Sequence, residues 1–285
     1  MKQKHWMFSF MSVLMWGASS VLIRLTFGSF SALTLVTARA WLAAITLLVF
    51  CAIKKMPLPR LRDVPIFLIT GAFGFSLYMI LYSMGFELVT AATGNVILAS
   101  SPIFSTLIAR LIFKERIRPL GWVFTGVSFA GILILMLWDG MLSINIGVIL
   151  MLIAAILFSG YSLVQRRMTQ RDYTAVQSSA YSLTGAAILM LPFMPSLVRD
   201  FSSATPGAIT VLLYLGICAS GLAFLCWAKA FSLAKRSADA ANMLYLTPFI
   251  ATLLAFVIFV EIPGWGTVVG GVVILFGLWM FQKKA

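Results

Sequence analysis

Charged side chains inside apolar stretches are where chemistry is expected, and this sequence has few of them. Each of its 8 acidic residues lies between apolar runs or close to the end of one. They are Asp63, Glu87, Glu115, Asp139, Asp172, Asp200, Asp239 and Glu261. A catalytic acid or a metal site needs such groups brought together away from water. Their positions therefore argue against enzymatic chemistry.

Nucleophiles, bases and metal ligands of other types are equally scarce. The only histidine, His5, lies at the start of the first apolar run, and the three cysteines form no CxxC motif. One histidine cannot complete a catalytic triad or a metal centre, and isolated cysteines in apolar runs pack as small hydrophobic residues. We therefore predict that the protein is not an enzyme and has no catalytic residues, no metal and no cofactor.

Arg39 differs from the other cations because it lies well inside an apolar run. It follows the start of the run 32–53 by about eight residues, roughly 12 Å along a helix that rises 1.5 Å per residue. A charge at that depth is costly and indicates function. Its planar guanidinium suits a substrate carboxylate, but it would equally stabilise the carbonyl groups of a broken neighbouring helix. The sequence leaves both roles open.

The elements that carry these residues are apolar helices. Of the 285 residues, 61% are hydrophobic and 10% are charged, and the mean hydropathy is +1.03. A soluble protein has about 25% charged residues, and a helix crosses a bilayer with about 20 apolar residues. Runs of this kind occupy 5–26, 32–53, 64–84, 91–113, 119–138, 146–164, 177–195, 207–228, 239–260 and 265–282. The sequence predicts an all-α integral membrane protein with ten transmembrane helices.

The positive charges indicate how this bundle is oriented. The net charge of +13 is spread over short clusters between the runs, which argues against a nucleic-acid partner. Most of the 21 lysines and arginines fall in every second connection. Positively charged loops stay in the cytoplasm, so both termini are predicted to be cytoplasmic. We expect a small-molecule substrate and membrane lipid as partners, and a monomer or a weak homodimer.

The two halves of the chain repeat each other. The segments SSPIFSTLIARLIFKERI (100–117) and LTPFIATLLAFVIFVEIP (246–263) share Pro, Thr, Leu, Ala, Ile, Phe and Glu at a shift of 146 residues. WGASSVLIR (16–24) aligns with FSGYSLVQR (158–166) at a shift of 142. We place the repeats at 1–140 and 141–285, with five helices each. An odd number of crossings inverts the second repeat, and transporters built this way bind substrate near the midplane between the halves.

Polar and aromatic side chains in apolar runs must find partners inside the protein, so we assign them to a central substrate site. With Arg39 they are Trp16, Tyr78, Tyr82, Asn95, Ser101, Tyr161, Ser162, Trp227, Asn242 and Tyr245. For the two asparagines, a hydrogen bond between helices is an equally good explanation. The matched prolines, Pro102 and Pro248, are the predicted hinges, because proline removes a backbone hydrogen bond. Without an acid at depth, Glu87 and Asp239 are the candidates for proton coupling.

Several of these segments resemble the ten-helix, EamA-type branch of the drug/metabolite transporter superfamily. They are WGASSVLIR, TARAWLAA (37–44), GVILMLIAAILFSGYSLVQRR (147–167) and the two proline-to-glutamate segments. The resemblance covers essentially the whole chain, although Phe158 stands where the family has tryptophan. It implies a secondary transporter that exports a small polar metabolite across the bacterial inner membrane by alternating access.

The resemblance does not name a substrate, and amino acids or related compounds are the favoured class. One alternative is a facilitative or proton-coupled carrier of nucleosides or of other small drugs and metabolites. A more distant alternative is a receptor or assembly subunit that transports nothing. That alternative explains the helices but not the inverted duplication.

Overall fold

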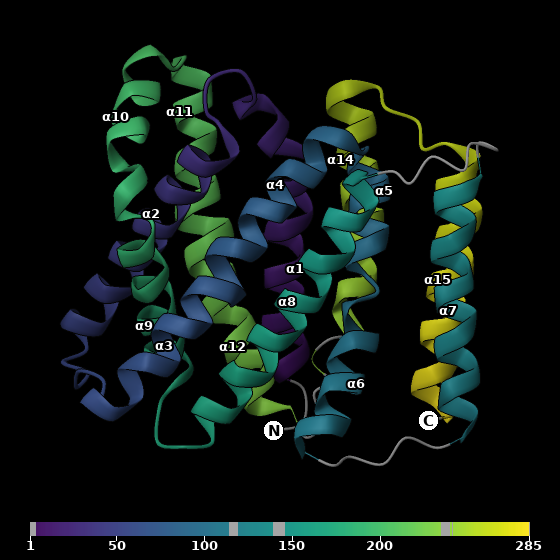
Figure 1. Ribbon diagram of the computed structural model, residues 1–285, viewed down its shortest axis with the longest axis horizontal. Coiled ribbons are helices and arrows are strands. Elements are labelled where there is room, and N and C mark those ends of the chain that lie inside the picture. Colours follow the sequence, from purple (N-terminus) through teal and green to yellow (C-terminus); the bar gives the residue numbers. More distant parts are fainter. Residues whose placement is uncertain (1–3, 114–118, 139–145, 235–239, 241, 285) are drawn as a thin grey trace.

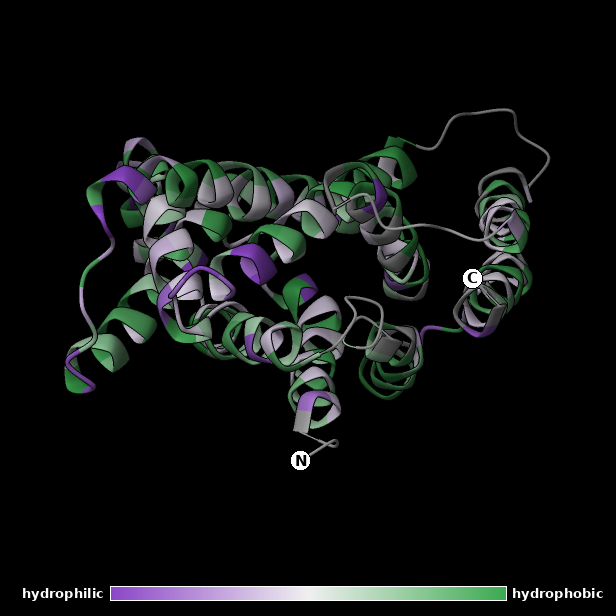
Figure 2. Cartoon of the chain, turned by 90° about the horizontal axis from the view of Figure 1, so that it is seen from below, coloured by the Kyte–Doolittle hydropathy of each residue, from purple (hydrophilic) through white to green (hydrophobic). Residues whose placement is uncertain are grey.

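The computed structural model describes residues 4–113, 119–138, 146–234, 240 and 242–284. Every regular element in these ranges is a helix, as predicted (Figure 1). The first turn of α1 and the last turns of α15 lie at the same end of the bundle (Figure 1). Hydrophobic residues predominate along the helices, as Figure 2 shows.

The helices follow one another in two series. Up to residue 137 they are α1 (Lys4–Leu22), η1 (Ile23–Thr26), α2 (Ala32–Ile53), η2 (Leu61–Asp63), α3 (Val64–Gly71), η3 (Ala72–Leu77), α4 (Tyr78–Leu88), α5 (Ala91–Leu98), α6 (Ser101–Phe113) and α7 (Pro119–Leu137). From residue 146 they are α8 (Ile146–Thr169), α9 (Ala175–Leu189), η4 (Leu191–Phe193), α10 (Met194–Ser203), α11 (Pro206–Leu213), η5 (Tyr214–Leu222), α12 (Ala223–Leu233), η6 (Asn242–Leu246), α14 (Thr247–Phe259) and α15 (Trp265–Lys284). Of these, η3 and η5 are π-helices, and the other η elements are 3₁₀-helices.

Five continuous helical segments are long and apolar enough to cross a membrane: His5–Thr26, Ala32–Ile53, Leu61–Leu88, Ile146–Thr169 and Pro206–Leu233. Ala175–Leu189 and Leu191–Ser203 together would make a sixth span, bent by 52°. The protein is therefore a multi-pass membrane protein by the composition and length of its helices. The total of ten spans and the cytoplasmic position of the termini stay predictions.

Hydroxyl side chains cap the N-terminal ends of several helices. At the start of α2, α5, α9 and α11 a side-chain oxygen accepts a hydrogen bond from a backbone N–H three residues later. The residues are Ser31, Thr90, Thr174 and Thr205. Such caps satisfy N–H groups that have no partner within the helix.

The helix boundaries recur at the shifts found in the sequence. The starts of α3 and α11 are 142 residues apart, while those of α6 and α14 are 146 apart. The recurrence includes an irregular feature, since π-helices begin at Ala72 and at Tyr214, again 142 residues apart. The boundary placed between residues 140 and 141 stays a prediction.

The helices α7 and α15 lie side by side at one edge of the molecule and pack mainly against each other (Figures 1 and 2). A Cβ atom on Gly131 would lie 2.7 Å from the backbone N of Ile274, and one on Gly277 would lie 2.8 Å from that of Ser128. The Ser128 Oγ donates to the carbonyl of Ile274 at 3.3 Å. Residues 146 positions apart thus form this helix crossing.

Candidate functional site

A small central cavity lies among α1, α2, α4, α5, α8 and the start of α14, and its volume is about 30 Å³. It has room for one or two water molecules. Its walls include predicted site residues, namely Trp16, Arg39, Tyr78, Tyr82, Asn95 and Ser101. They also include residues that the sequence did not single out for the site: Ser19, Met79, Leu98, Ala99, Phe158, Leu244 and Thr247.

Arg39 is the charged group of this central cavity. Its side chain is only 1% exposed, and its Nε donates to the Oγ of Ser220 at 3.0 Å. Ser220 belongs to the π-helix η5, so this bond joins α2 to an irregular part of α11–α12. The Nη1 is buried and has no hydrogen-bond partner among the described residues. None of the ion pairs found in the described ranges includes Arg39.

Two hydroxyl groups in the cavity wall also lack a described hydrogen-bond partner. The Oγ1 of Thr247 is buried and has no partner in the part of the chain described, and the buried Oγ of Ser19 lies close to the Tyr82 hydroxyl without meeting the geometry of a hydrogen bond. A buried polar group without a partner costs about 1–3 kcal/mol, and at a cavity a water molecule or a bound ligand supplies the missing partner. The sequence offered weak signals for both: Ser19 lies three residues after Trp16, and Thr247 directly precedes Pro248.

Aromatic rings form a large part of the cavity wall. The ring of Trp16 lies 5.4 Å from that of Phe158 and 5.1 Å from that of Trp227, measured between centroids. The Nε1 of Trp16 donates to the carbonyl of Ala219 at 2.9 Å. Trp16 and Phe158 are 142 residues apart, so the duplicated positions of the two halves meet here. The Tyr78 ring lies 5.4 Å from the Phe158 ring.

Asn95 uses its amide donors within the protein. Its Nδ2 donates to the Oγ of Ser20 at 2.8 Å and to the carbonyl of Ala91 at 2.7 Å. Ser101 also bonds locally, because its Oγ donates to the carbonyl of Leu98 at 2.6 Å. For Asn95 this geometry favours the explanation as a bond between helices, here α5 and α1.

Three of the predicted site residues are buried but do not line the cavity in this conformation. Trp227 donates its Nε1–H to the Oγ of Ser162 at 2.9 Å, and Ser162 donates to the carbonyl of Phe158 at 2.9 Å. The ring of Tyr161 packs where a Cβ on Gly74 would lie, at 2.6 Å. These side chains pack against Phe158 and the π-helix η3 outside the cavity.

The predicted hinges lie next to breaks in the helices. Pro248 is the second residue of α14, and α14 directly follows the 3₁₀-helix η6. In the first half, α5 ends at Leu98 and α6 starts at Ser101, just before Pro102. Proline is well tolerated in the first turn of a helix, where its missing N–H needs no partner. The side chain of Pro102 lies outside the described residues.

Some of the other predicted residues also fall outside the described part of the chain. The side chains of Asn242 and Tyr245 do so, and Asp239 does so entirely. Glu87 is exposed near the end of α4. No group of three His, Cys, Asp or Glu residues that could hold a metal ion occurs among the residues described.

The end of the bundle opposite the termini is held by an ion pair that sequence reasoning missed. Nη1 of Arg24 donates to Oε2 of Glu261, and Nη2 of Arg24 donates to the carbonyl of Val89 at 3.1 Å. The side chains of Arg24 and Glu261 are 24% and 16% exposed. Arg24 is the last residue of WGASSVLIR and Glu261 is the last residue shared by the two proline-to-glutamate segments, but the sequence did not show that the two side chains pair.

The other end is joined through Tyr173. Its hydroxyl donates to Asp63 at 2.8 Å and accepts from the backbone N–H of Arg60 at 3.1 Å. Burial raises the pKa of the Tyr173 phenol. These bonds connect the segment before α3 with the one before α9.

Comparison with known proteins shows two matches to one family model. Residues 4–137 and residues 145–282 each match the EamA-like transporter family. A protein of known crystal structure aligns with 100% of this chain and 99% of its own, with a TM-score of 0.71 and 18% identity, which shows a shared fold.

Several related sequences are transporters by name. The uncharacterised transporter YdfC of Bacillus subtilis (strain 168) is 29% identical over 84% of this chain and 78% of its own. A probable terminal-alkyne amino-acid exporter of Streptantibioticus cattleyicolor is 26% identical over 96% of this chain and 92% of its own. An S-adenosylmethionine uptake transporter of Rickettsia prowazekii is 27% identical over 68% of this chain and 64% of its own.

Proposed function

This chain belongs to the EamA-like transporter family, and from that premise we propose that it exports amino acids or related small polar metabolites across the bacterial inner membrane. Export proceeds by alternating access, with the termini in the cytoplasm. The family and the relatives point to transport rather than to enzymatic catalysis. Arg39, with its Nη1 unpartnered at the wall of the central cavity, is the observation that carries the substrate class.

A buried cation without a counter-ion favours an anionic ligand. Removing a guanidinium from water costs several kcal/mol, and none of the described carboxylates pairs with Arg39. A substrate carboxylate would accept from Nη1 in the fork geometry that guanidinium groups prefer. The hydroxyl groups of Ser19 and Thr247 supply further hydrogen bonds, and nearby aromatic faces suit an ammonium group. An amino acid carries both charges.

The size of the cavity supports a cycle in which the site opens and closes. A volume of about 30 Å³ is far smaller than a typical ligand pocket of about 300 Å³ or more. The bundle must therefore open before an amino acid can enter, and the Arg24–Glu261 pair must break for release at that end. The prolines at the starts of α6 and α14 lie where bending of these helices would open the cavity.

The composition of the cavity favours facilitated exchange over a carboxylate-coupled proton pump. A coupling acid usually lies at membrane depth, where burial moves its titration toward neutral pH. None of the described residues that line the cavity is a carboxylate, and Glu87 is exposed near a helix end. Coupling through Glu87 or Asp239 predicts a strict requirement for a pH gradient, which exchange does not.

A nucleoside-bearing substrate is the second candidate, and the aromatic wall favours it. Bases stack on aromatic side chains, and each stacked pair contributes about 1–3 kcal/mol. The rings of Trp16, Tyr78 and Phe158 all line the cavity. One relative is an S-adenosylmethionine uptake transporter by name.

Counterflow in proteoliposomes tests this proposal. Vesicles are loaded with an unlabelled compound and then diluted into buffer that contains a trace of the same compound in labelled form. The compounds are a panel of amino acids, their carboxamides and nucleosides. We expect accumulation of amino acids and none of the carboxamides, since these lack the carboxylate. Equal counterflow of acids and carboxamides would refute the role of Arg39. No counterflow across the panel would refute the proposed substrate classes.

A further inference from the structure

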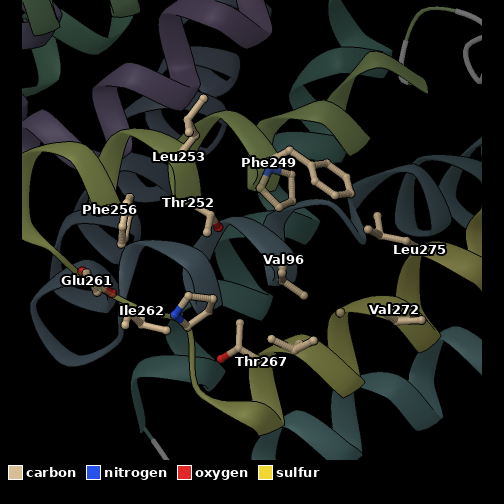
Figure 3. Close-up of a pocket in the computed structure, with 14 residues that line it drawn as sticks. Val96, Phe249, Thr252, Leu253, Phe256, Glu261, Ile262, Thr267, Val272 and Leu275 are labelled. Carbon is tan, nitrogen blue, oxygen red and sulfur yellow. The ribbon is translucent and has the colours of Figure 1, made fainter.

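A second hollow, which we call the lateral groove, lies between α5, α14 and α15 and has a volume of about 580 Å³ (Figure 3). Its walls are mostly apolar and include Phe249, Leu253 and Phe256 of α14 and Val272 and Leu275 of α15. The side chain of Leu253 is 64% exposed, so the groove opens onto the surface of the bundle. In a membrane protein, hydrocarbon covers such a surface.

Glu261, a charged residue that lines the lateral groove, lies at one end of it. Figure 3 shows Glu261 and Ile262 at one end and Leu275 at the other. The Oε2 of Glu261 accepts from Arg24, while its Oε1 is buried and has no partner among the described residues. The hydroxyl of Thr267 is already bonded to that of Thr93 at 2.8 Å. The groove therefore ends beside a buried acceptor that lacks a described partner and belongs to a carboxylate paired with a cation.

We propose that the lateral groove binds a phospholipid with a primary ammonium headgroup, such as phosphatidylethanolamine. The ammonium donates to the Oε1 of Glu261, and the phosphate lies against the remaining N–H groups of Arg24, whose side chain is 24% exposed. One acyl chain follows the apolar wall from Thr267 to Leu275, a rise of about 12 Å along α15. The opposite charges of headgroup and site then lie opposite each other.

Charge complementarity distinguishes this occupant from others. A soluble metabolite would find few partners for its own polar groups along the apolar wall, and a second copy of the chain does not explain the unused acceptor. A lipid with a quaternary ammonium fills the groove equally well but cannot donate a hydrogen bond to Glu261. The proposal thus predicts selectivity between two lipids of similar shape.

Lipid binding to the purified, full-length protein is the measurement that tests this inference. The detergent-solubilised protein is titrated with phosphatidylethanolamine or phosphatidylcholine of identical acyl chains, and bound lipid is counted by native mass spectrometry. We expect roughly tenfold tighter binding of phosphatidylethanolamine, the size of one charge-assisted hydrogen bond. Glu261→Gln should remove this preference, since its amide oxygen carries no charge.

A second pair of variants examines the apolar wall independently of Glu261. Leu253→Trp fills the groove and should weaken the binding of both lipids. Val257→Trp is the matched control, because Val257 also lies on α14, is 69% exposed and does not line the groove. Thermal unfolding of each variant verifies that it is folded.

Three results would overturn the proposal. Equal binding of the two lipids to the unchanged protein would indicate only non-specific annular lipid. Unchanged binding in Leu253→Trp would place the lipid elsewhere. A dimer of the unchanged protein that Leu253→Trp dissociates, with no effect of Glu261→Gln on lipid preference, would assign the groove to a second copy of the chain. None of these results depends on transport, so the proposed function is tested separately.

Discussion

Arg24 and Glu261 are separated by 237 residues and form an ion pair. Arg24 lies in η1 at the end of the first span, and Glu261 lies in the connection between α14 and α15. The same guanidinium donates a hydrogen bond to the carbonyl of Val89, just after α4. A single side chain therefore joins segments from three parts of the chain at the end opposite the termini.

Breaking this pair should make the central cavity accessible from that end. In a chain without its native cysteines, a cysteine placed at Ser19 is labelled with a membrane-impermeant maleimide. We expect Arg24→Ala to speed labelling about fivefold, since a partly exposed ion pair contributes about 1 kcal/mol. The double exchange Arg24→Glu with Glu261→Arg should restore slow labelling. Unchanged rates in the single variant would show that the pair does not close the cavity.

Replacing Arg39 should impair transport of carboxylate substrates while the protein stays folded. Arg39→Lys keeps a charge but loses the planar fork, so we expect a KM at least about tenfold higher with a smaller change in maximal rate. Arg39→Leu should be inactive. The control is Arg199→Ala, an exposed arginine on α10. Loss of folded protein in both Arg39 variants would instead support the structural role, through the bond to Ser220.

Removing the hydroxyl of Ser19 or Thr247 should not destabilise the protein in the absence of substrate. Neither hydroxyl has a partner among the described residues, so alanine removes a desolvated polar group. Ser12 is the contrasting position, because its Oγ donates to the carbonyl of Ala223 at 2.8 Å. Thermal unfolding in detergent should show a loss of about 1 kcal/mol only for Ser12→Ala. Transport should fall in Ser19→Ala and Thr247→Ala. A loss of stability in either variant would show that its hydroxyl has a hydrogen-bond partner and would contradict the prediction.

The crossing of α7 and α15 should depend on a glycine. A Cβ on Gly277 would lie 2.3 Å from the Ser128 Oγ and 2.9 Å from the carbonyl oxygen of Phe124, whereas one on Gly126 would meet nothing within 4 Å. We expect Gly277→Ala to cost about 1–3 kcal/mol from overpacking. Gly126→Ala on the same pair of helices should be neutral. Equal melting temperatures for the two variants would contradict the close approach.

Much of the helical fold follows from hydropathy. The run 32–53 coincides with α2, and the run 119–138 nearly coincides with α7. Hydropathy reports how long an apolar segment is but not its hydrogen-bond register. It therefore missed the break between α5 and α6, the bend that follows Met190, and the two π-helices. Those features depend on packing, such as the ring of Tyr161 against Gly74.

The candidate site was only partly predictable for a similar reason. Position along a run sets the depth of a side chain but not the direction in which it points around the helix. Arg39 and Tyr82 reach the cavity, whereas Tyr161 and Trp227 lie behind its wall at comparable depth. Ser19 and Thr247 were missed because small hydroxyl residues are common in helix packing. Only the tertiary arrangement shows that the hydroxyl groups of Ser19 and Thr247 have no hydrogen-bond partner among the described residues.

The paired π-helices give the central cavity an adjustable lining. A π-helix closes each hydrogen bond over five residues instead of four, so it holds one extra residue relative to an α-helix, and one residue corresponds to a rotation of about 100°. Tyr78 directly follows η3, and Ser220, which accepts from Arg39, lies within η5. If either extra residue moved along its helix, the side chains that it passed would turn to a new face. Each half thus carries its own means of changing which groups Arg39 meets, without tilting a whole helix.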